Sequence, residues 1–434
     1  MSIESIHTED RIFHPSKQLS KNSRVKDLAQ YHKLCESYKS DYEGTWGKLA
    51  KDLLIWDKPF TKILDDSTPP FYRWFDDGKL NASFNCLDRH VDSQPNKTAI
   101  IFEADDGNVT KVTYQELYER VCQFSNGLKT LNLNIGDRVI IYLPMGIESI
   151  VAMQACARLG LTHSVVFGGF SAKSLQERIS DTTAKLVITS DGQFRGGKVI
   201  PLKQAIDDAI EMGNCESVEK VIVFKRTGEP FSKNDRDIIW DDLIRNQSTK
   251  CPPVSVSAEH PLFILYTSGS TGKPKGILLT HAGLNNLTHT SNRFFGVHKK
   301  SRVLQFSSFG FDVAVWEIFM ALAAGATLCL GTGKSLFSLL SLPKTLREEK
   351  ITMALLPPSL LNVISPEGLD SLETVIAVGE RCTNENVKKW APGRKFFNGY
   401  GPAEGTVTVS AYLTNAEEPQ RPLGPPIGRP LENI

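Results

Sequence analysis

The sequence predicts an α/β protein built on a doubly wound, mainly parallel sheet. From Lys97 onward, short apolar runs typical of buried strands alternate with capped or amphipathic helical segments, which is the pattern of βαβ units. At 434 residues the chain also exceeds the size that one hydrophobic core supports, so two or three sub-cores are expected. A third observation is a loop rich in glycine and hydroxyl residues that directly follows a short apolar run, 262–266.

Residues 1–75 are predicted to form an N-terminal extension. This stretch is polar at first and then rich in tryptophan, phenylalanine and proline, as in Phe71, Tyr72 and Trp74. We expect it to be anchored on the main body through these aromatic side chains. Residues 76–260 and 261–434 are then expected to form a first and a second α/β subdomain.

Two local signals locate helices in the first subdomain. Thr113 and Glu116 form a capping box, and Gly160 ends a helical pattern. The elements expected there are strand 98–103, a helix from 113 to about 130, strand 138–143, helix 148–159, strand 164–167, helix 171–179, and strands 186–189 and 221–224.

In the second subdomain the alternation resumes after the glycine-rich loop. The elements expected are strand 262–266, helix 316–324, strand 327–330, helix 342–349, strands 353–356 and 375–378, helix 384–390 and strand 395–398. No internal repeat and no low-complexity tract is visible.

Composition excludes several classes of protein. A net charge of +1 without a basic block argues against a general binder of nucleic acid or membrane surfaces. The eight scattered cysteines contain no CxxC pair and predict reduced thiols, and residues 1–15 carry no signal-peptide pattern. The longest uncharged run, 318–333, is too short to span a bilayer. We therefore expect a soluble cytoplasmic protein that binds neither nucleic acid nor membrane.

The glycine-rich loop carries the chemistry of a polyphosphate site. Glycines let backbone N–H groups turn inward, hydroxyls add donors and lysines add positive charge. It differs from the common phosphate loop of nucleotide hydrolases, because Pro274 follows the first lysine. A flexible linker is the alternative, but linkers normally lack a preceding buried strand. The residues expected to bind ATP phosphates are Thr267, Ser268, Gly269, Ser270, Thr271, Gly272, Lys273 and Lys275.

This loop, together with Gly379-Glu380 and the stretch from Asn398 to Glu404, resembles the motifs of the adenylate-forming superfamily. Its members include acyl-CoA synthetases, luciferases and peptide-synthetase adenylation domains. The resemblance implies the large N-terminal domain of these enzymes, with sheets and helices stacked as αβαβα layers. The last subdomain and the small C-terminal domain would lie beyond Ile434, so we expect this chain alone to bind nucleotide and to adenylate poorly or not at all.

The resemblance to subfamilies is split. Residues 31 to about 250 resemble acetyl-CoA synthetase, most clearly in 78–90, 165–170 and 195–203. Residues from about 305 instead resemble an adenylation domain of nonribosomal peptide synthetases, in 311–317 and 398–402. Acetyl-CoA synthetases carry a tryptophan just after the tyrosine of the last motif, which shrinks the acetate pocket, whereas this chain has Gly401.

The reaction implied by the resemblance is attack of a carboxylate on the α-phosphate of ATP, which gives an acyl-adenylate and pyrophosphate. Thr267 and Glu404 would be the catalytic residues, with Glu404 holding Mg²⁺. Ala403 departs from the family's usual threonine and removes one hydroxyl donor, worth about 0.5–1.5 kcal/mol. The residues that would flank the adenine are Gly379, Glu380, Arg381, Gly399 and Tyr400, with Tyr400 stacked on the base, and Asn398 would also bind ATP.

Asp312 is expected to decide which acid is bound. In amino-acid adenylation domains the matching aspartate pairs with the substrate's α-ammonium, while the alternative is a helix N-cap. Acetate near an ionised Asp312 at roughly 5 Å would be repelled by about 3 kcal/mol at an effective dielectric of about 20, so the electrostatics favour an amino acid. The rest of the acid pocket, carried over by motif position, would be Val313, Trp316, Leu355, Ile376, Val378, Gly399, Val407 and Thr408, which predicts a small or apolar side chain.

The acceptor thiol could be CoA or a carrier protein's phosphopantetheine. Arg195 and Lys198 match positions where acetyl-CoA synthetases contact CoA, and Phe167, Gly168 and Gly169 match the pantetheine path. The alternative is that Arg195 and Lys198 are simply solvated.

Three functions follow from these observations. The first is an ATP-dependent acid–thiol ligase that activates a small or apolar amino acid, and the second is a synthetase for acetyl-CoA or another short-chain acyl-CoA. The third, suggested by Ala403, is a nucleotide-binding scaffold without catalysis.

Overall fold

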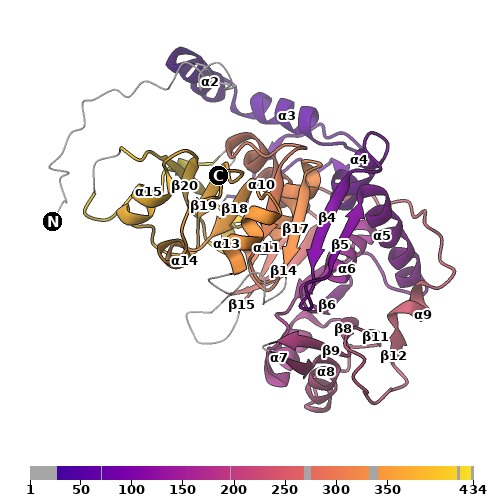
Figure 1. Cartoon of the computed structure of the whole chain (residues 1–434). Coiled ribbons are helices and arrows are strands. Elements are labelled where there is room, and N and C mark those ends of the chain that lie inside the picture. The colour runs from indigo at the N-terminus through magenta and orange to yellow at the C-terminus, as the bar shows by residue number, and fades with distance from the viewer. Residues whose placement is uncertain are drawn as a thin grey trace, which may run out of the picture. The chain divides into compact units, whose positions relative to one another are not determined.

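The computed structural model describes residues 27–69, 71–195, 197–267, 275–331, 341–417 and 421–431. The chain forms two compact units, divided between Leu53 and Leu54. In the first unit the described part consists of two helices, α2 (Leu28–Ser40) and α3 (Tyr42–Leu53), which the sequence analysis did not predict (Figure 1). Asp27 stabilises the start of α2, because its side chain accepts the N–H of Gln30 at 2.8 Å.

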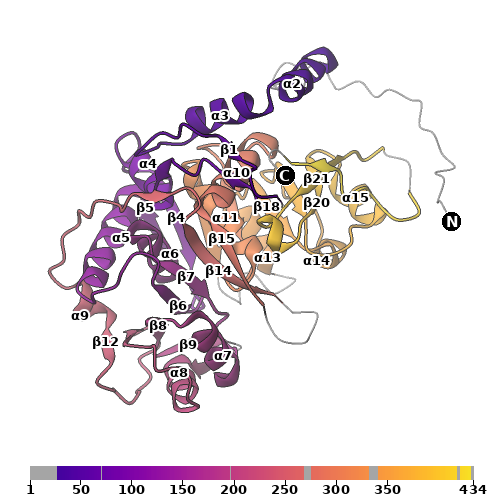
Figure 2. The same cartoon turned by 180° about the vertical axis from the view of Figure 1, so that it is seen from behind.

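The second unit contains a seven-stranded sheet in the order β12-β11-β8-β6-β7-β14-β15 (Figure 2). All neighbours are parallel except the last pair, β14 and β15, which form an antiparallel hairpin. The strands are β12 (Asp237–Ile239), β11 (Lys220–Phe224), β8 (Leu186–Ser190), β6 (Arg138–Tyr142), β7 (Thr162–Val165), β14 (Pro261–Thr267) and β15 (Lys275–Thr280).

A nine-stranded sheet in the same unit has the order β22-β21-β20-β19-β18-β16-β17-β4-β5. It is parallel from β20 to β4 and antiparallel at both edges. The strands are β22 (Arg429–Pro430), β21 (Ser410–Thr414), β20 (Lys395–Tyr400), β19 (Thr374–Ala377), β18 (Met353–Leu356), β16 (Arg302–Gln305), β17 (Thr327–Gly331), β4 (Thr98–Glu103) and β5 (Val109–Thr113).

Helices cover the faces of both sheets. The longer ones are α5 (Tyr114–Lys129), α6 (Ile147–Leu159), α7 (Ala172–Thr182), α8 (Leu202–Glu211), α10 (His281–Phe294), α11 (Asp312–Ala323), α13 (Ser341–Glu348) and α15 (Asn384–Trp390). The shorter helices are η1 (Phe84–Asp88), α4 (Arg89–Val91), α9 (Trp240–Ile244), α14 (Pro358–Val363) and η2 (Ala403–Gly405), and the strands outside the two large sheets are β1 (Leu64–Asp65), β2 (Arg73–Trp74), β3 (Lys79–Leu80), β9 (Gly192–Arg195), β10 (Lys198–Pro201) and β13 (Val256–Ser257). Among the described residues, no helix is both long enough and apolar enough to cross a bilayer.

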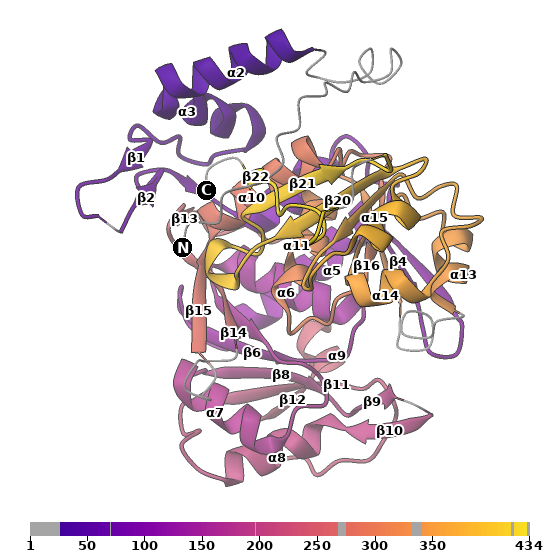
Figure 3. The same cartoon turned by 90° about the vertical axis from the view of Figure 1, so that its left-hand side faces the viewer.

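Alternate side chains of the strands divide the core into three layers. In β4, Ile100 and Phe102 join the central cluster between the sheets, whereas Ile101 faces the outer cluster with α13, α14 and α15. In β6, Ile141 joins the central cluster, whereas Ile140 packs with α7 and α8. Helices α5, α6, α10 and α11 contribute to the central cluster, so the unit is layered αβαβα, as predicted (Figure 3).

The sequence-based element assignments are mostly confirmed. The capping box of Thr113 and Glu116 is present at α5, and Gly160 ends α6 with a left-handed φ of 69°. Two boundaries were wrong: α11 begins at Asp312 instead of 316, and β7 spans Thr162–Val165 instead of 164–167. Helices α8, α9, α10 and α14 were not predicted.

The two sheets share a strand order that the sequence does not reveal as a repeat. Five parallel strands run β7-β6-β8-β11-β12 in one sheet and β17-β16-β18-β19-β20 in the other. In both sheets, one strand is added on one side of the second of these strands and the following strands are added on its other side. Ligands of such sheets bind at the carboxyl ends of the strands, near the point where the strand order changes direction. Along the sequence the sheets interleave, since β4 and β5 belong to the nine-stranded sheet and β14 and β15 to the other. The predicted subdomain ranges, 76–260 and 261–434, therefore stay a proposal.

Candidate functional site

A pocket of about 440 Å³ opens at the carboxyl ends of β19 and β20. These strands are parallel neighbours with Ala377 paired to Asn398, so the residues that follow β19 lie beside the end of β20. All five residues predicted to flank the adenine line this pocket, as does Asn398, which was predicted to bind ATP. Its lining is Gly379, Glu380, Arg381, Cys382, Asn398, Gly399, Tyr400, Gly401, Leu423, Pro425 and Ile427.

The far wall of this pocket, from residues 421–427, was not predicted. Leu423 and Ile427 are 76% and 51% exposed, and Tyr400 is 50% exposed. The amide of Asn398 holds this segment by donating to the carbonyl of Pro426 at 2.8 Å, and Arg381 Nε donates to the Leu423 carbonyl at 3.3 Å. Exposed apolar and aromatic surfaces around one opening suit a flat, apolar-faced ligand such as a nucleobase.

Glu380 is already engaged by the protein. Its carboxylate accepts the N–H of Ser359 at 2.9 Å and the Ser359 hydroxyl at 3.0 Å, in the first turn of α14. The side chain therefore fixes the 379–381 turn against α14. The backbone of this turn remains available to the pocket.

The predicted phosphate loop joins β14 to β15. Thr267 and Lys275 are the last pair of this hairpin, and β15 contacts η2, the short helix that carries Glu404. The structure thus brings the hairpin next to Glu404. The predicted ligands Ser268, Gly269, Ser270, Thr271, Gly272 and Lys273 lie outside the described residues.

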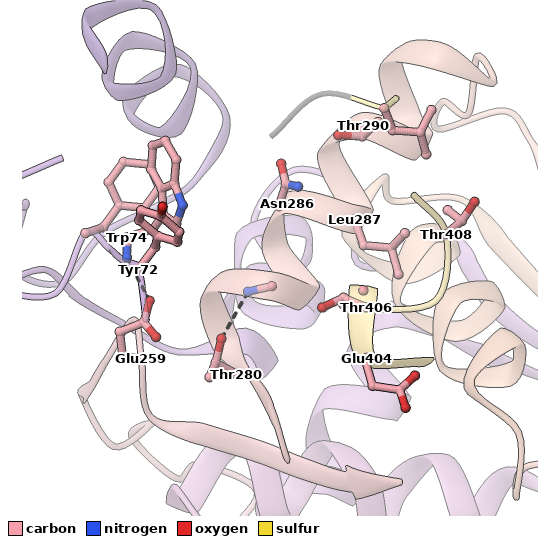
Figure 4. A pocket seen from close by; sticks show the side chains of 14 residues that line it. Tyr72, Trp74, Glu259, Thr280, Asn286, Leu287, Thr290, Glu404, Thr406 and Thr408 are labelled. Atoms are coloured by element: carbon pink, nitrogen blue, oxygen red, sulfur yellow. Dashed lines mark hydrogen bonds between the residues drawn. The ribbon is translucent and has the colours of Figure 1, made fainter. Parts of the chain in front are cut away.

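Glu404 is exposed and lines a second pocket, of about 360 Å³ (Figure 4). No group of three or more candidate metal ligands occurs in the part of the chain that the structure describes. Mg²⁺ in nucleotide sites is commonly held by one or two carboxylates, with the remaining oxygens supplied by phosphates and water. A single exposed carboxylate beside the hairpin therefore fits the magnesium expected with a nucleotide.

The loop that carries Glu404 is tight and strained. A Cβ at Gly401 would lie 2.3 Å from the carbonyl oxygen of Val407 and 2.4 Å from Thr408 Cα, so only glycine fits there. Thr406 and Val407 both have left-handed φ values, 58° and 75°, which are unusual for β-branched residues. The N–H of Thr408 donates to the carbonyl of Thr406 at 3.0 Å, closing a γ-turn on Val407. Such strain is concentrated at functional sites.

Asp312 occupies the first position of α11, and Phe311 is the N-cap residue. The alternative that Asp312 is the N-cap is therefore wrong, although its carboxylate accepts the N–H of Val313 at 2.8 Å. Burial raises the pKa of Asp312, and the nearby charge of Glu404 raises this pKa further. Asp312 and Glu404 thus lie close enough to interact.

The predicted acid wall is packed into the core. Trp316 is fully buried, packs against Phe295 at 5.5 Å between ring centroids, and donates its indole N–H to Ser291. Neither of the two pockets described above includes Trp316 or Leu355. The structure nevertheless places the residues predicted to line the acid pocket near one another. Their role in binding the acid stays a prediction. The central cluster includes Val313, Trp316, Leu355, Ile376, Val378 and Val407, Gly399 lies against Ile376, and Thr408 lines the second pocket.

The residues expected along the CoA path also meet. Phe167, Gly168 and Gly169 follow β7, and Arg195 and Lys198 pair across the β9–β10 hairpin. The Arg195 guanidinium lies 5.3 Å from the centroid of the Phe167 ring, within the range of a cation–π contact.

Gln193 and Gly310 lie close to the residues expected along the CoA path. The amide of Gln193 donates to the Gly168 carbonyl at 2.5 Å, and a Cβ at Gly310 would lie 3.3 Å from Phe167 Cβ. Gly310 is two residues before Asp312, so the CoA path leads to the expected acid site.

Sequence reasoning missed most of the lining of the second pocket. Glu259 precedes β14, Thr280 ends β15, and Asn286 and Thr290 lie on α10; no motif identifies these four residues. The aromatic residues at 72–75 were recognised only as anchors. The lining is Tyr72, Trp74, Phe75, Glu259, Thr280, Gly283, Asn286, Leu287, Thr290, Glu404, Gly405, Thr406, Thr408 and Leu431.

Comparison with known proteins identifies two families along the chain. Residues 87–434 match the family described as AMP-binding enzyme, and residues 31–86 match the acetyl-coenzyme A synthetase N-terminus. The chain is 57% identical over 276 residues to an acetyl-coenzyme A synthetase of Thiobacillus denitrificans, a match that covers 64% of this chain and 42% of that protein. It is 58% identical over 277 residues to the acetyl-coenzyme A synthetase of Methylobacillus flagellatus, with coverages of 64% and 42%. The matched segment thus spans about 42% of the length of these relatives.

Proposed function

Since the chain belongs to the AMP-binding enzyme family, we propose that it is an ATP-dependent, AMP-forming ligase that joins a short-chain carboxylic acid to a thiol. Its α/β fold is consistent with the large N-terminal domain of adenylate-forming enzymes. The observation that carries the proposal is the convergence of motifs around Gly379 and Tyr400 on one pocket, next to the strand that leads out of the phosphate loop.

The first half-reaction would form a bond between an acid oxygen and the α-phosphorus of ATP and break the bond to pyrophosphate. Two anions must meet, so the protein contributes mainly positioning and charge neutralisation. Tyr400 and Leu423 would hold the adenine, and the loop after Thr267 would hold the phosphates. Glu404 would hold Mg²⁺, which supplies positive charge to the leaving pyrophosphate when bound. Ala403 offers no hydroxyl for the α-phosphate.

Acetate or a similar acid is better supported than an amino acid. The relatives above are named acetyl-coenzyme A synthetase. The repulsion of about 3 kcal/mol between Asp312 and acetate assumes that both are ionised. Burial and Glu404 raise the pKa of Asp312, and a protonated Asp312 could donate a hydrogen bond to the acid instead. An amino acid remains a second candidate because an ionised Asp312 would pair with its ammonium group.

CoA is the acceptor that we propose, in place of a carrier protein. Arg195 lies over Phe167 on a hairpin that also carries Lys198, which suits a thiol whose far end is phosphorylated. In the second half-reaction the thiol sulfur would attack the acyl carbon, and AMP would leave. The contact between Gly310 and Phe167 would direct the thiol toward the acid.

Binding measurements on the 434-residue chain and exchange measurements on a chain extended to the length of the relatives test this proposal. AMP binding is measured by calorimetry, and ATP–pyrophosphate exchange is measured with acetate, propionate and a panel of amino acids. Tyr400→Ala should weaken AMP binding by about 1–3 kcal/mol, the usual contribution of one base–aromatic stack. Tyr42→Ala, which changes an exposed tyrosine of the first unit, is the control and should bind AMP normally.

The outcomes separate the candidates. Exchange that depends on acetate supports the proposal, and exchange that depends only on amino acids supports the second candidate. AMP binding without exchange supports a nucleotide-binding scaffold. Absence of AMP binding to the wild-type chain would overturn all three.

A further inference from the structure

The second pocket has a part that the proposed reaction does not use. Tyr72 and Trp74 form one wall near Glu259, and α10 forms the opposite wall (Figure 4). Phe75, which neighbours Trp74, also lines this pocket. The Glu404 side chain points away from Tyr72 and Trp74 in this view. The aromatic wall is therefore separate from the expected nucleotide chemistry.

The aromatic wall is rigidly supported. Phe75 packs against Phe60, with ring centroids 4.4 Å apart, and against Trp56 at 5.6 Å. Trp74 lies 5.7 Å from Phe75 at an interplanar angle of 57°. The φ of Phe75 is 57°, a left-handed conformation that is a clear outlier for a bulky residue. Strain of this kind persists only where surrounding contacts enforce it.

The charge of this wall is negative and poorly compensated. One carboxylate oxygen of Glu259 accepts the N–H of Trp74 at 3.0 Å, and burial raises the Glu259 pKa. Among the residues that the structure describes, the lining contains two glutamates, Glu259 and Glu404, and no lysine, arginine or histidine. Arg73 is close to Glu259 but forms ion pairs with Asp65 at 2.5 Å and with Asp76 at 3.4 Å.

We propose that this wall binds a small alkylammonium ion, with its alkyl groups on the faces of Tyr72 and Trp74, which Phe75 supports from the core, and its charge toward Glu259. Aromatic faces attract organic cations through their quadrupole, and a desolvated carboxylate strengthens that attraction. A hard metal ion would need several oxygen ligands, which the aromatic wall lacks, and an anion would be repelled. The inference goes beyond the proposed ligase function and does not depend on it.

Calorimetric titration of the 434-residue chain tests the inference. Choline is the cationic probe, and 3,3-dimethylbutan-1-ol is its uncharged isostere. We expect choline to bind at least tenfold more tightly than the isostere. Glu259→Gln and Trp74→Leu should each weaken choline binding at least fivefold, and Trp74→Phe should restore part of the Trp74→Leu loss. Glu229→Gln, at an exposed position outside the pocket, is the matched control and should bind choline like the wild type.

AMP is titrated into the same samples. Retained AMP binding in Glu259→Gln and Trp74→Leu shows that the variants are folded and that only the ammonium site has changed. Equal affinity for choline and its isostere, or normal choline binding in Glu259→Gln and Trp74→Leu, would overturn the inference. Failure of the wild type to bind choline would also overturn it, whereas failure to bind AMP would count against the ligase function alone.

Discussion

Replacing Glu317 with glutamine should change how the stability of the protein depends on pH. Glu317 lies on α11 and is completely buried. Its carboxylate accepts the N–H of Ser307 and the side-chain amide of Gln305, each at 3.1 Å. Burial nevertheless raises the pKa of Glu317 from 4.5 to about 8, because the hydrogen bonds do not repay the lost hydration.

The magnitude follows from this pKa difference. Between pH 4.5 and 8 the folded state binds more protons at Glu317 than the unfolded chain does, so the free energy of unfolding falls as pH rises. The slope is about 1.4 kcal/mol per pH unit, and the full loss is about 5 kcal/mol. Glutamine keeps one acceptor oxygen for Ser307 but cannot ionise. Glu317→Gln should therefore gain stability relative to the wild type as pH rises.

Urea denaturation at pH 5, 6, 7, 8 and 9 measures this difference. The free energy of unfolding of Glu317→Gln minus that of the wild type should rise steadily to pH 8 and then level off. The exposed Glu229→Gln variant should show no such trend. A flat difference for Glu317→Gln across this range would show that Glu317 is already ionised in the folded protein and would refute the reasoning.

Two further substitutions test the packing around the site and in the core. Gly401→Ala would place a Cβ 2.3 Å from the Val407 carbonyl oxygen; we expect a loss of stability of about 1–3 kcal/mol and weaker AMP binding, measured by thermal denaturation and calorimetry. Asp88→Asn would leave Arg158, whose side chain is 1% exposed, without the carboxylate that it contacts at 2.8 Å; we expect a loss of about 3–5 kcal/mol by urea denaturation.

The sequence alone was sufficient to predict those helix boundaries that depend on residues close together in the chain. The capping box at the start of α5 involves only Thr113 and Glu116, which are three residues apart. Gly160, at the end of α6, adopts a left-handed conformation that glycine adopts easily. Both helix boundaries were therefore predictable from nearby residues. The start of β7 was misplaced because Thr162 is fixed by its register with Arg138 on β6. That pairing is a long-range contact, which the local hydrophobic pattern does not contain.

The same distinction explains the candidate site. The residues near Gly379 and Tyr400 were predicted from the family resemblance, and the structure brings them together because β19 and β20 are parallel neighbours whose carboxyl ends lie side by side. Leu423 was not predictable, because it reaches the pocket through antiparallel β21 and β22 and through the Asn398 amide. Glu259 was missed because it lies before β14, outside the glycine-rich motif, and only the fold brings it into the same pocket as residues of α10.

The loops at the carboxyl ends of the two sheets approach each other near Phe167 and Gly310. Phe167 follows β7 in one sheet, and Gly310 lies between β16 and α11 of the other, yet a Cβ added to Gly310 would lie only 3.3 Å from Phe167 Cβ. The carboxyl ends of both sheets therefore meet at this point, although each sheet has its own reversal of strand order. We infer that the thiol is held mainly by the β9–β10 hairpin, through Arg195, and the adenine mainly by the nine-stranded sheet, through Tyr400. The acid beside Asp312 would then lie where the two sets of loops touch, which is where a ligase must bring both partners together.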